Sequence, residues 1–155
     1  TPVSPLQILF AQGLIQLSSA LVSFIGVTLV YHLLFDYELR GSWTIFLLTY
    51  IFVILAMYSI GIFIGSIVPD QKSANVWSSV AYFTMLLFSG ATIPYEAMPR
   101  LFQWIMDILP LSHGIHLLKQ TSTGASLTDG LFHILILTLC IVIGLGGAIK
   151  FFKWK

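Results

Sequence analysis

The chain has 155 residues, of which 57% are hydrophobic and only 8% charged, and its formal net charge is +1 at pH 7. An ordinary soluble domain is about 25% charged, so this composition excludes a soluble protein and predicts an integral membrane protein in contact with lipid. The net charge says nothing about nucleic acid, and no basic patch with interleaved aromatic residues occurs outside the C-terminal tail. We therefore expect no nucleic-acid partner.

Four stretches lack Asp, Glu, Lys and Arg: 1–35, 41–69, 73–95 and 130–149. Each reaches or exceeds the roughly 20 apolar residues that a helix needs to cross about 30 Å of hydrocarbon. Because lipid offers the backbone no hydrogen-bond partners, such segments must be helical. The sequence predicts an all-α, polytopic membrane helix bundle, a single transmembrane domain over 1–155, with spans at about 6–34, 43–67, 74–93 and 129–150.

The ends of the chain are expected on the cytoplasmic side of the cell membrane. The chain begins at Thr1 rather than Met and enters an apolar stretch at once, so we expect a segment of a longer polypeptide. Four spans place both ends on one side, which would hold Lys72, Lys150, Lys153 and Lys155, whereas the other would hold Arg40, Arg100 and Lys119. The three lysines clustered beside the last span favour a cytoplasmic location by the positive-inside rule.

Polar residues follow one face of two of the spans. In the first span they are spaced 4, 3 and 4 residues apart, at Gln12, Gln16, Ser19 and Ser23, and in the third they are Asn75, Ser78 and Tyr82. Two interpretations are open for each face. The side chains either pack and hydrogen-bond against a neighbouring helix, or they line a substrate path.

Small residues in the second and last spans predict close helix packing. Gly61 and Gly65 have the GxxxG spacing that lets two backbones approach, and Cys140, Gly144 and Gly147 are similarly spaced. Cys140 is the single cysteine, so no disulfide within the chain is expected.

The segment 94–124, before the last span, is divided by prolines. Pro94 lacks an amide hydrogen and disfavours helical geometry in the residue before it, so the third span is expected to end or bend there. Pro99 suits the first turn of a new helix, and Pro110 starts a second one that Gly124 would terminate.

The first of these two helices is amphipathic and short. From Pro99 to Leu109 it has eleven residues and would extend only about 16 Å, half a bilayer. The insert is either a re-entrant hairpin, because irregular backbone at membrane depth must be covered, or an interfacial helical hairpin lying on the membrane.

Charged and histidine residues allow a few local hypotheses. Asp70 and Lys72 form a solvated turn or contact a cytoplasmic partner. Glu96 lies near the expected start of a helix, where an acid is stabilising, and its pairing with Arg100 as a gate is a hypothesis. His113 and His116 lie at i and i+3, but two ligands do not make a metal site, so none is predicted.

A run within the chain, LLFSGATIPYEAMPRLFQWIMDILPLSHGIHLLKQ, resembles the signature region of type-2 ABC exporter permeases. The matching elements are a Ser-Gly pair, a proline-acidic element, a second proline and a Pro-Leu pair. They are Ser89 with Gly90, Pro94 with Glu96, Pro99, and Pro110 with Leu111. TPVSP at the start resembles the end of the cytoplasmic coupling segment, and ELRGS a short outer loop. The whole chain would be spans three to six of a six-span permease.

The resemblance implies an exporter half that moves a drug, peptide, lipid or glycan outward, multidrug efflux included. A separate ATPase subunit would bind ATP and Mg, because the chain has no GxxxxGK[ST] loop; we expect no enzyme activity and no cofactor in this chain. A second permease copy would complete a dimer with the path between protomers. The outer gate would comprise Ser89, Gly90, Pro94, Glu96, Pro99, Arg100, Pro110 and His113, and the cytoplasmic contacts Thr1, Pro2, Asp70 and Lys72.

Two other classes of protein compete with this hypothesis. A secondary transporter or channel without an ATPase would be favoured by a carboxylate or lysine in mid-span, and the four predicted spans contain none. A membrane enzyme is disfavoured because no catalytic constellation occurs.

Ser112 and His113 replace the aromatic or asparagine residues usual around the Pro-Leu pair in the exporter family.

Overall fold

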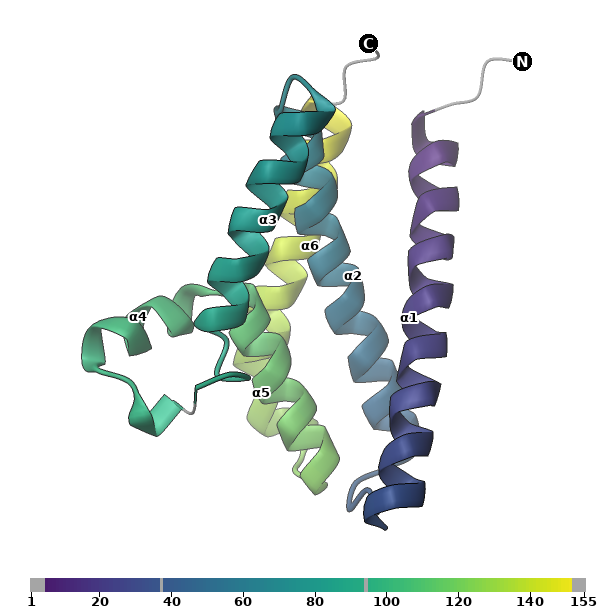
Figure 1. Ribbon diagram of the computed structural model, residues 1–155, viewed down its shortest axis with the longest axis vertical. Coiled ribbons are helices and arrows are strands. Elements are labelled where there is room, and N and C mark those ends of the chain that lie inside the picture. The colour runs from purple at the N-terminus through teal and green to yellow at the C-terminus, as the bar shows by residue number, and fades with distance from the viewer. Residues whose placement is uncertain (1–4, 37, 94, 152–155) are drawn as a thin grey trace. The chain divides into compact units, whose positions relative to one another are not determined.

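The computed structural model describes residues 5–36, 38–93 and 95–151, which are helical throughout apart from short connections (Figure 1). The all-α prediction is confirmed, since no strand occurs in these ranges. The α-helices are α1 (Pro5–Phe35), α2 (Trp43–Ile67), α3 (Gln71–Leu87), α4 (Arg100–Ile108), α5 (Pro110–Thr123) and α6 (Leu131–Phe151). Two 3-10 helices, η1 (Tyr95–Ala97) and η2 (Leu127–Gly130), lie in the connections. The chain divides into two units, Thr1–Arg40 and Gly41–Lys155.

Three helical segments among the described residues are long and apolar enough to cross a membrane: Phe10–Phe35, Trp43–Ile67 and Leu127–Phe151. They correspond to the first, second and fourth predicted spans. The third predicted span, 74–93, falls on α3, which has 17 residues and ends at Leu87. At 1.5 Å per residue α3 is about 25 Å long, somewhat less than the hydrocarbon thickness.

The first unit contains α1, many of whose large apolar side chains are exposed. Examples are Phe10, Ile15 and Leu34, each about 70% exposed. The predicted polar stripe is exposed as well, and its Ser23 hydroxyl donates to the Ser19 carbonyl at 3.0 Å. A helix that is apolar all round belongs in lipid or against other helices.

The second unit is built on the pairing of α2 with α6. The Ser59 hydroxyl of α2 donates to the Ala56 carbonyl at 2.7 Å and also to the Cys140 carbonyl of α6 at 3.2 Å. A Cβ on Gly144 would lie 2.7 Å from the Ser59 carbonyl oxygen, so only glycine allows this approach. The close packing predicted from the small residues of the last span is therefore confirmed.

The GxxxG pair of α2 behaves differently from the small residues of α6. A Cβ on Gly61 or Gly65 would meet no described atom within 4 Å. The close packing predicted for this pair does not occur within the described part of the chain.

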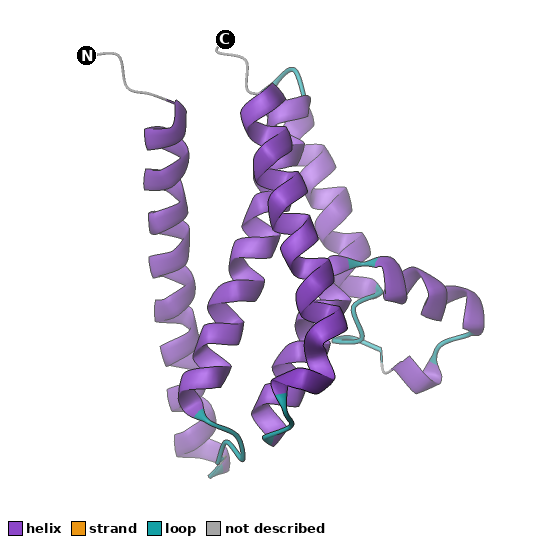
Figure 2. Cartoon of the chain, turned by 180° about the vertical axis from the view of Figure 1, so that it is seen from behind, coloured by secondary structure: helices purple, strands orange, loops and turns teal. Residues whose placement is uncertain are grey.

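The helices α3 and α5 follow one another along the length of α2 and α6, while α4 lies across this direction (Figures 1 and 2). α5 packs against both α2 and α6. A Cβ on Gly114 of α5 would lie 2.7 Å from Val53 Cγ1 of α2, and the Gly41 amide donates to the Ser122 carbonyl at 3.2 Å. The second half of the predicted hairpin is thus part of the bundle.

We expect the substitution Gly144→Ala to destabilise the bundle by about 1–3 kcal/mol, because the added methyl must push the α2 backbone away. The thermal unfolding midpoint of the full-length protein in detergent measures this effect. Gly146→Ala is the matched control, since its Cβ would meet nothing within 4 Å. Equal midpoints for the two variants would contradict the close α2–α6 approach.

Candidate functional site

Three hydroxyl groups donate hydrogen bonds to backbone carbonyls at the C-terminal end of α3. A helix leaves its last four carbonyls without partners in the helix. Ser89 and Thr92 donate to the Leu86 carbonyl at 3.0 and 3.1 Å, and Thr92 also lies 3.2 Å from the Leu87 carbonyl. Ser112, from α5, donates to the Phe88 carbonyl at 3.0 Å. The helix therefore ends at Leu87, before Pro94, which lies outside the described residues.

Gly90 turns the chain away from α3 toward α4. It has a φ of +75°, a left-handed conformation that suits glycine. A Cβ at Gly90 would also lie 2.9 Å from Met106 Cε. Its neighbour Ser89 is buried, and the Phe88 and Phe102 rings stack with centroids 5.4 Å apart. The predicted Ser-Gly element thus forms a packed corner between α3 and α4.

The short helix α4 has opposite buried and exposed faces. Met106 is 1% exposed and packs toward Gly90, whereas Leu101, Trp104 and Ile108 are 73–74% exposed along one row. Pro99 is the N-cap, and Arg100 is the first helical residue and is exposed. The Glu96 side chain lies outside the described residues, so its pairing with Arg100 stays a prediction.

Both predicted boundaries of α5 are confirmed. Pro110 occupies its first turn, and Gly124 ends it in a left-handed conformation with φ 81°. The Gly124 amide donates to the carbonyls of Gln120 and Thr121. Five of the α5 side chains or glycine positions are buried: Ser112, His113, Gly114, Leu117 and Thr121.

Three histidines meet where α4, α5 and α6 come together. His113 Nδ1 lies 2.8 Å from His133 Nδ1 of α6, and His113 Nε2 lies 3.0 Å from the Asp107 carbonyl at the end of α4. The His116 ring stacks on the His133 ring with a centroid distance of 5.4 Å and an interplanar angle of 5°. Burial lowers the pKa of His113, and its hydrogen bond to the Asp107 backbone opposes this effect.

A cavity of about 290 Å³ adjoins the histidines. Its lining also includes Met106, Ser112 and Phe132. Within the described ranges, no group of three or more His, Cys, Asp or Glu side chains is arranged to hold a metal. The contact between His113 and His133 had no counterpart in the sequence prediction, because the two residues are far apart in the chain.

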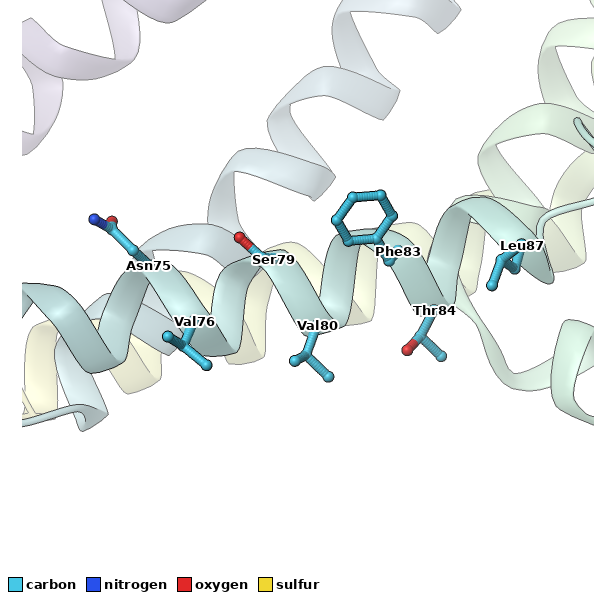
Figure 3. A pocket seen from close by; sticks show the side chains of 7 residues that line it. All are labelled: Asn75, Val76, Ser79, Val80, Phe83, Thr84 and Leu87. Atoms are coloured by element: carbon cyan, nitrogen blue, oxygen red, sulfur yellow. The ribbon is translucent and has the colours of Figure 1, made fainter.

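An open groove of about 510 Å³ runs along α3 (Figure 3). It is lined by Asn75, Val76, Ser79, Val80, Phe83, Thr84 and Leu87. Of the polar face predicted on the third span, Asn75 lines the groove, whereas Ser78 and Tyr82 do not. The residues missed were Ser79 and Phe83, which follow Asn75 at i+4 and i+8 and so form a straighter row along the helix.

None of the other predicted site residues in the described part of the chain lines this groove. Gln12, Gln16, Ser19 and Ser23 belong to the first unit and are exposed. Asp70 caps α3, since its carboxylate accepts from the Ser73 amide at 2.9 Å and the Ser73 hydroxyl at 2.8 Å. Lys72 is exposed beside this cap. Thr1 and Pro2 lie outside the described residues.

The comparisons with known proteins all indicate the same family. A family profile described as ABC-2 type transporter matches residues 1–122. Nodulation protein J of Rhizobium leguminosarum bv. viciae is 32% identical over 89 residues, which cover 57% of this chain and 34% of the relative. The inner membrane transport permease YhhJ of Escherichia coli (strain K12) is 28% identical over 120 residues, which cover 75% and 31%.

A more distant kind of relative is the ABC transporter eupT of Phoma sp, 27% identical over 106 residues, or 68% of this chain and 7% of the relative. The chain spans about a third of the length of nodulation protein J and of YhhJ. No solved structure matches it.

We expect Ser112→Ala to loosen the junction between α3 and α5, because the Phe88 carbonyl loses its partner. The loss of one such hydrogen bond, about 1 kcal/mol, should raise hydrogen exchange in 86–92 roughly fivefold. Ser122→Ala is the matched control, since that hydroxyl donates to Lys119 within its own helix. Unchanged exchange in Ser112→Ala would argue against this junction.

Proposed function

Because the chain belongs to the ABC-2 type transporter family, we propose that it is part of the membrane permease of an ABC exporter. The observation that carries the proposal is the family match over residues 1–122, together with relatives named as a transport permease and an ABC transporter. Three apolar helices of spanning length agree with a multi-pass membrane protein. ATP and Mg would bind to a separate ATPase subunit.

In the proposed topology α3 is the fourth spanning helix and both ends of the chain are cytoplasmic. The predicted hairpin 94–124, which contains α4 and α5, would then dip into the membrane from outside. The burial of α5 between α2 and α6 supports a re-entrant placement over an interfacial one, because a helix lying on the surface would not pack so deeply. The exposed row on α4, formed by Leu101, Trp104 and Ile108, would then contact lipid, where apolar side chains are stable.

The groove along α3 is the proposed substrate path, closed by a second permease copy in a dimer. Its lining is mostly apolar, with the polar side chains of Asn75, Ser79 and Thr84 at intervals. Val76 and Val80 are 60% and 51% exposed there. Such a surface suits an amphipathic cargo: a drug, a lipid, an apolar peptide or a glycan carried on a lipid. The corner at Ser89 and Gly90 would close the path on the outer side.

We expect an ATP-binding subunit to co-purify with the full-length protein from its native membrane. Mild detergent extraction followed by mass spectrometry identifies it, and a fused ATP-binding domain elsewhere in the polypeptide would serve equally. The reason is that this chain carries no phosphate-binding loop with which to use ATP. If neither a subunit nor a fused domain is found, the exporter proposal is wrong.

We expect Val80→Trp to reduce export roughly tenfold or more, because an indole would fill the groove on α3. Untargeted mass spectrometry of cells and medium, compared with a deletion strain, measures the exported compounds. Val142→Trp is the matched control, since Val142 is 62% exposed on α6 and lies outside the groove. A substrate path elsewhere is indicated if both variants export equally while both are present in the membrane at wild-type level.

A further inference from the structure

The protonation state of the histidine pair follows from its geometry. The Asp107 carbonyl can only accept, so His113 Nε2 must carry a hydrogen. A neutral imidazole has one N–H, and His113 Nδ1 is therefore an acceptor. The 2.8 Å contact then requires His133 Nδ1 to donate. Both tautomers of the neutral pair are thus assigned from hydrogen bonding alone.

One added proton leaves this hydrogen bond in place. On His133 Nε2 it changes nothing between the two rings. On His113 Nδ1 it is accommodated once His133 moves its own hydrogen to Nε2 and accepts through Nδ1. In either arrangement a single hydrogen lies between the two Nδ1 atoms, and the bond becomes charge-assisted.

A second proton cannot be accommodated in the same way. Both Nδ1 atoms would then carry hydrogens and face each other at 2.8 Å, with no acceptor between them. The ring centroids are 5.0 Å apart, so two positive charges would also repel. His116, stacked on His133, adds a third imidazole to the repulsion in acid. The two rings titrate as a pair rather than as independent groups.

The groups around the pair act in both directions, since Asp107 favours a protonated His113 whereas His116 opposes it. Those acting electrostatically on His113 are His116 and Asp107, and those acting on His133 are His113 and His116. α2 presents Val53 to α5, and the residue after α3 presents the Phe88 carbonyl to Ser112. The other titratable residues on the packed elements are Tyr50 and Tyr58 of α2, Lys72 and Tyr82 of α3, Arg100 of α4, Lys119 of α5, Asp129 of η2, and Cys140 and Lys150 of α6.

The burial of His113 determines whether acid stabilises or destabilises the docked position of α5. His113 is 4% exposed, so its ring has little contact with bulk water while α5 stays docked. Because burial lowers the pKa of His113, a state in which the start of α5 has separated from α6 binds more protons in acid than the docked state, in which the two helices are packed. Docking therefore weakens as pH falls through the ordinary histidine range of about 6.5. The adjoining cavity of about 290 Å³ leaves room for a displaced ring.

We propose that His113 and His133 form an acid-sensitive latch, which keeps the start of α5 on α6 with zero or one proton and releases it with two. The far end of α5 stays attached through the Gly41 amide and the Ser122 carbonyl, so the helix swings at its Pro110 end. The latch is a property of the bundle and does not depend on what is transported.

Hydrogen exchange of the full-length protein in lipid nanodiscs tests the latch, because both membrane faces then meet the same buffer. Rates are corrected for the intrinsic pH dependence of exchange and compared at about pH 7.5 and about pH 5. The wild type should lose protection in 108–116 by about fivefold in acid, the equivalent of one hydrogen bond. Protection in 118–123 should stay unchanged. Equal protection of 108–116 at both pH values overturns the proposal.

The substitution His133→Asn removes titration but keeps a side chain that can turn to donate or accept. We expect its 108–116 segment to stay protected in acid, and a response equal to that of the wild type would overturn the latch. His32→Asn, at an exposed histidine of α1, is the matched control and should respond like the wild type.

His116→Asn gives a second test that leaves the His113–His133 bond intact. His116 stacks on His133 only while α5 is packed on α6, so removing its charge lets the docked state bind the second proton more easily, and release should move to lower pH. Release at an unchanged or higher pH contradicts the proposed repulsion, even where His133→Asn does not fold.

Discussion

The close approach of α2 and α6 is the constraint on which the second unit depends. Ser59 donates to a carbonyl of each helix, and Gly144 supplies the gap that lets the two backbones meet. In lipid no hydrophobic force drives helices together, so van der Waals contact at small residues and bonds of this kind must hold them. α5 packs against both helices of this pair, and α5 in turn holds the end of α3 through Ser112. The groove and the histidine cluster are therefore positioned by one helix pair.

Features set by neighbours in the chain were predictable. Long uncharged runs predicted helices, and Pro110 and Gly124 predicted both ends of α5, because proline lacks an amide hydrogen and glycine adopts positive φ. The end of α3 was not predicted, since one of the three hydroxyls that close it, Ser112, comes from another helix. The sequence around Pro94 predicted the end of this helix at about residue 93, whereas it ends at Leu87.

The faces of the apolar helices were harder to predict than their ends. In a soluble helix polarity separates core from surface, whereas a membrane helix has apolar residues on both sides. The row of Asn75, Ser79 and Phe83 therefore differed little in composition from the predicted row of Asn75, Ser78 and Tyr82. The pairing of His113 with His133 depends on the packing of α5 against α6, and no local pattern encodes such a contact.

The succession of α3 and α5 has a mechanical consequence. α2 and α6 are unbroken helices, whereas α3 and α5 are two separate helices joined through the contact between Phe88 and Ser112. Bending a continuous helix strains many backbone hydrogen bonds at once, whereas flexing this joint disturbs a few hydroxyl contacts. Deformation of the unit would therefore concentrate at this joint, to which α4 is attached.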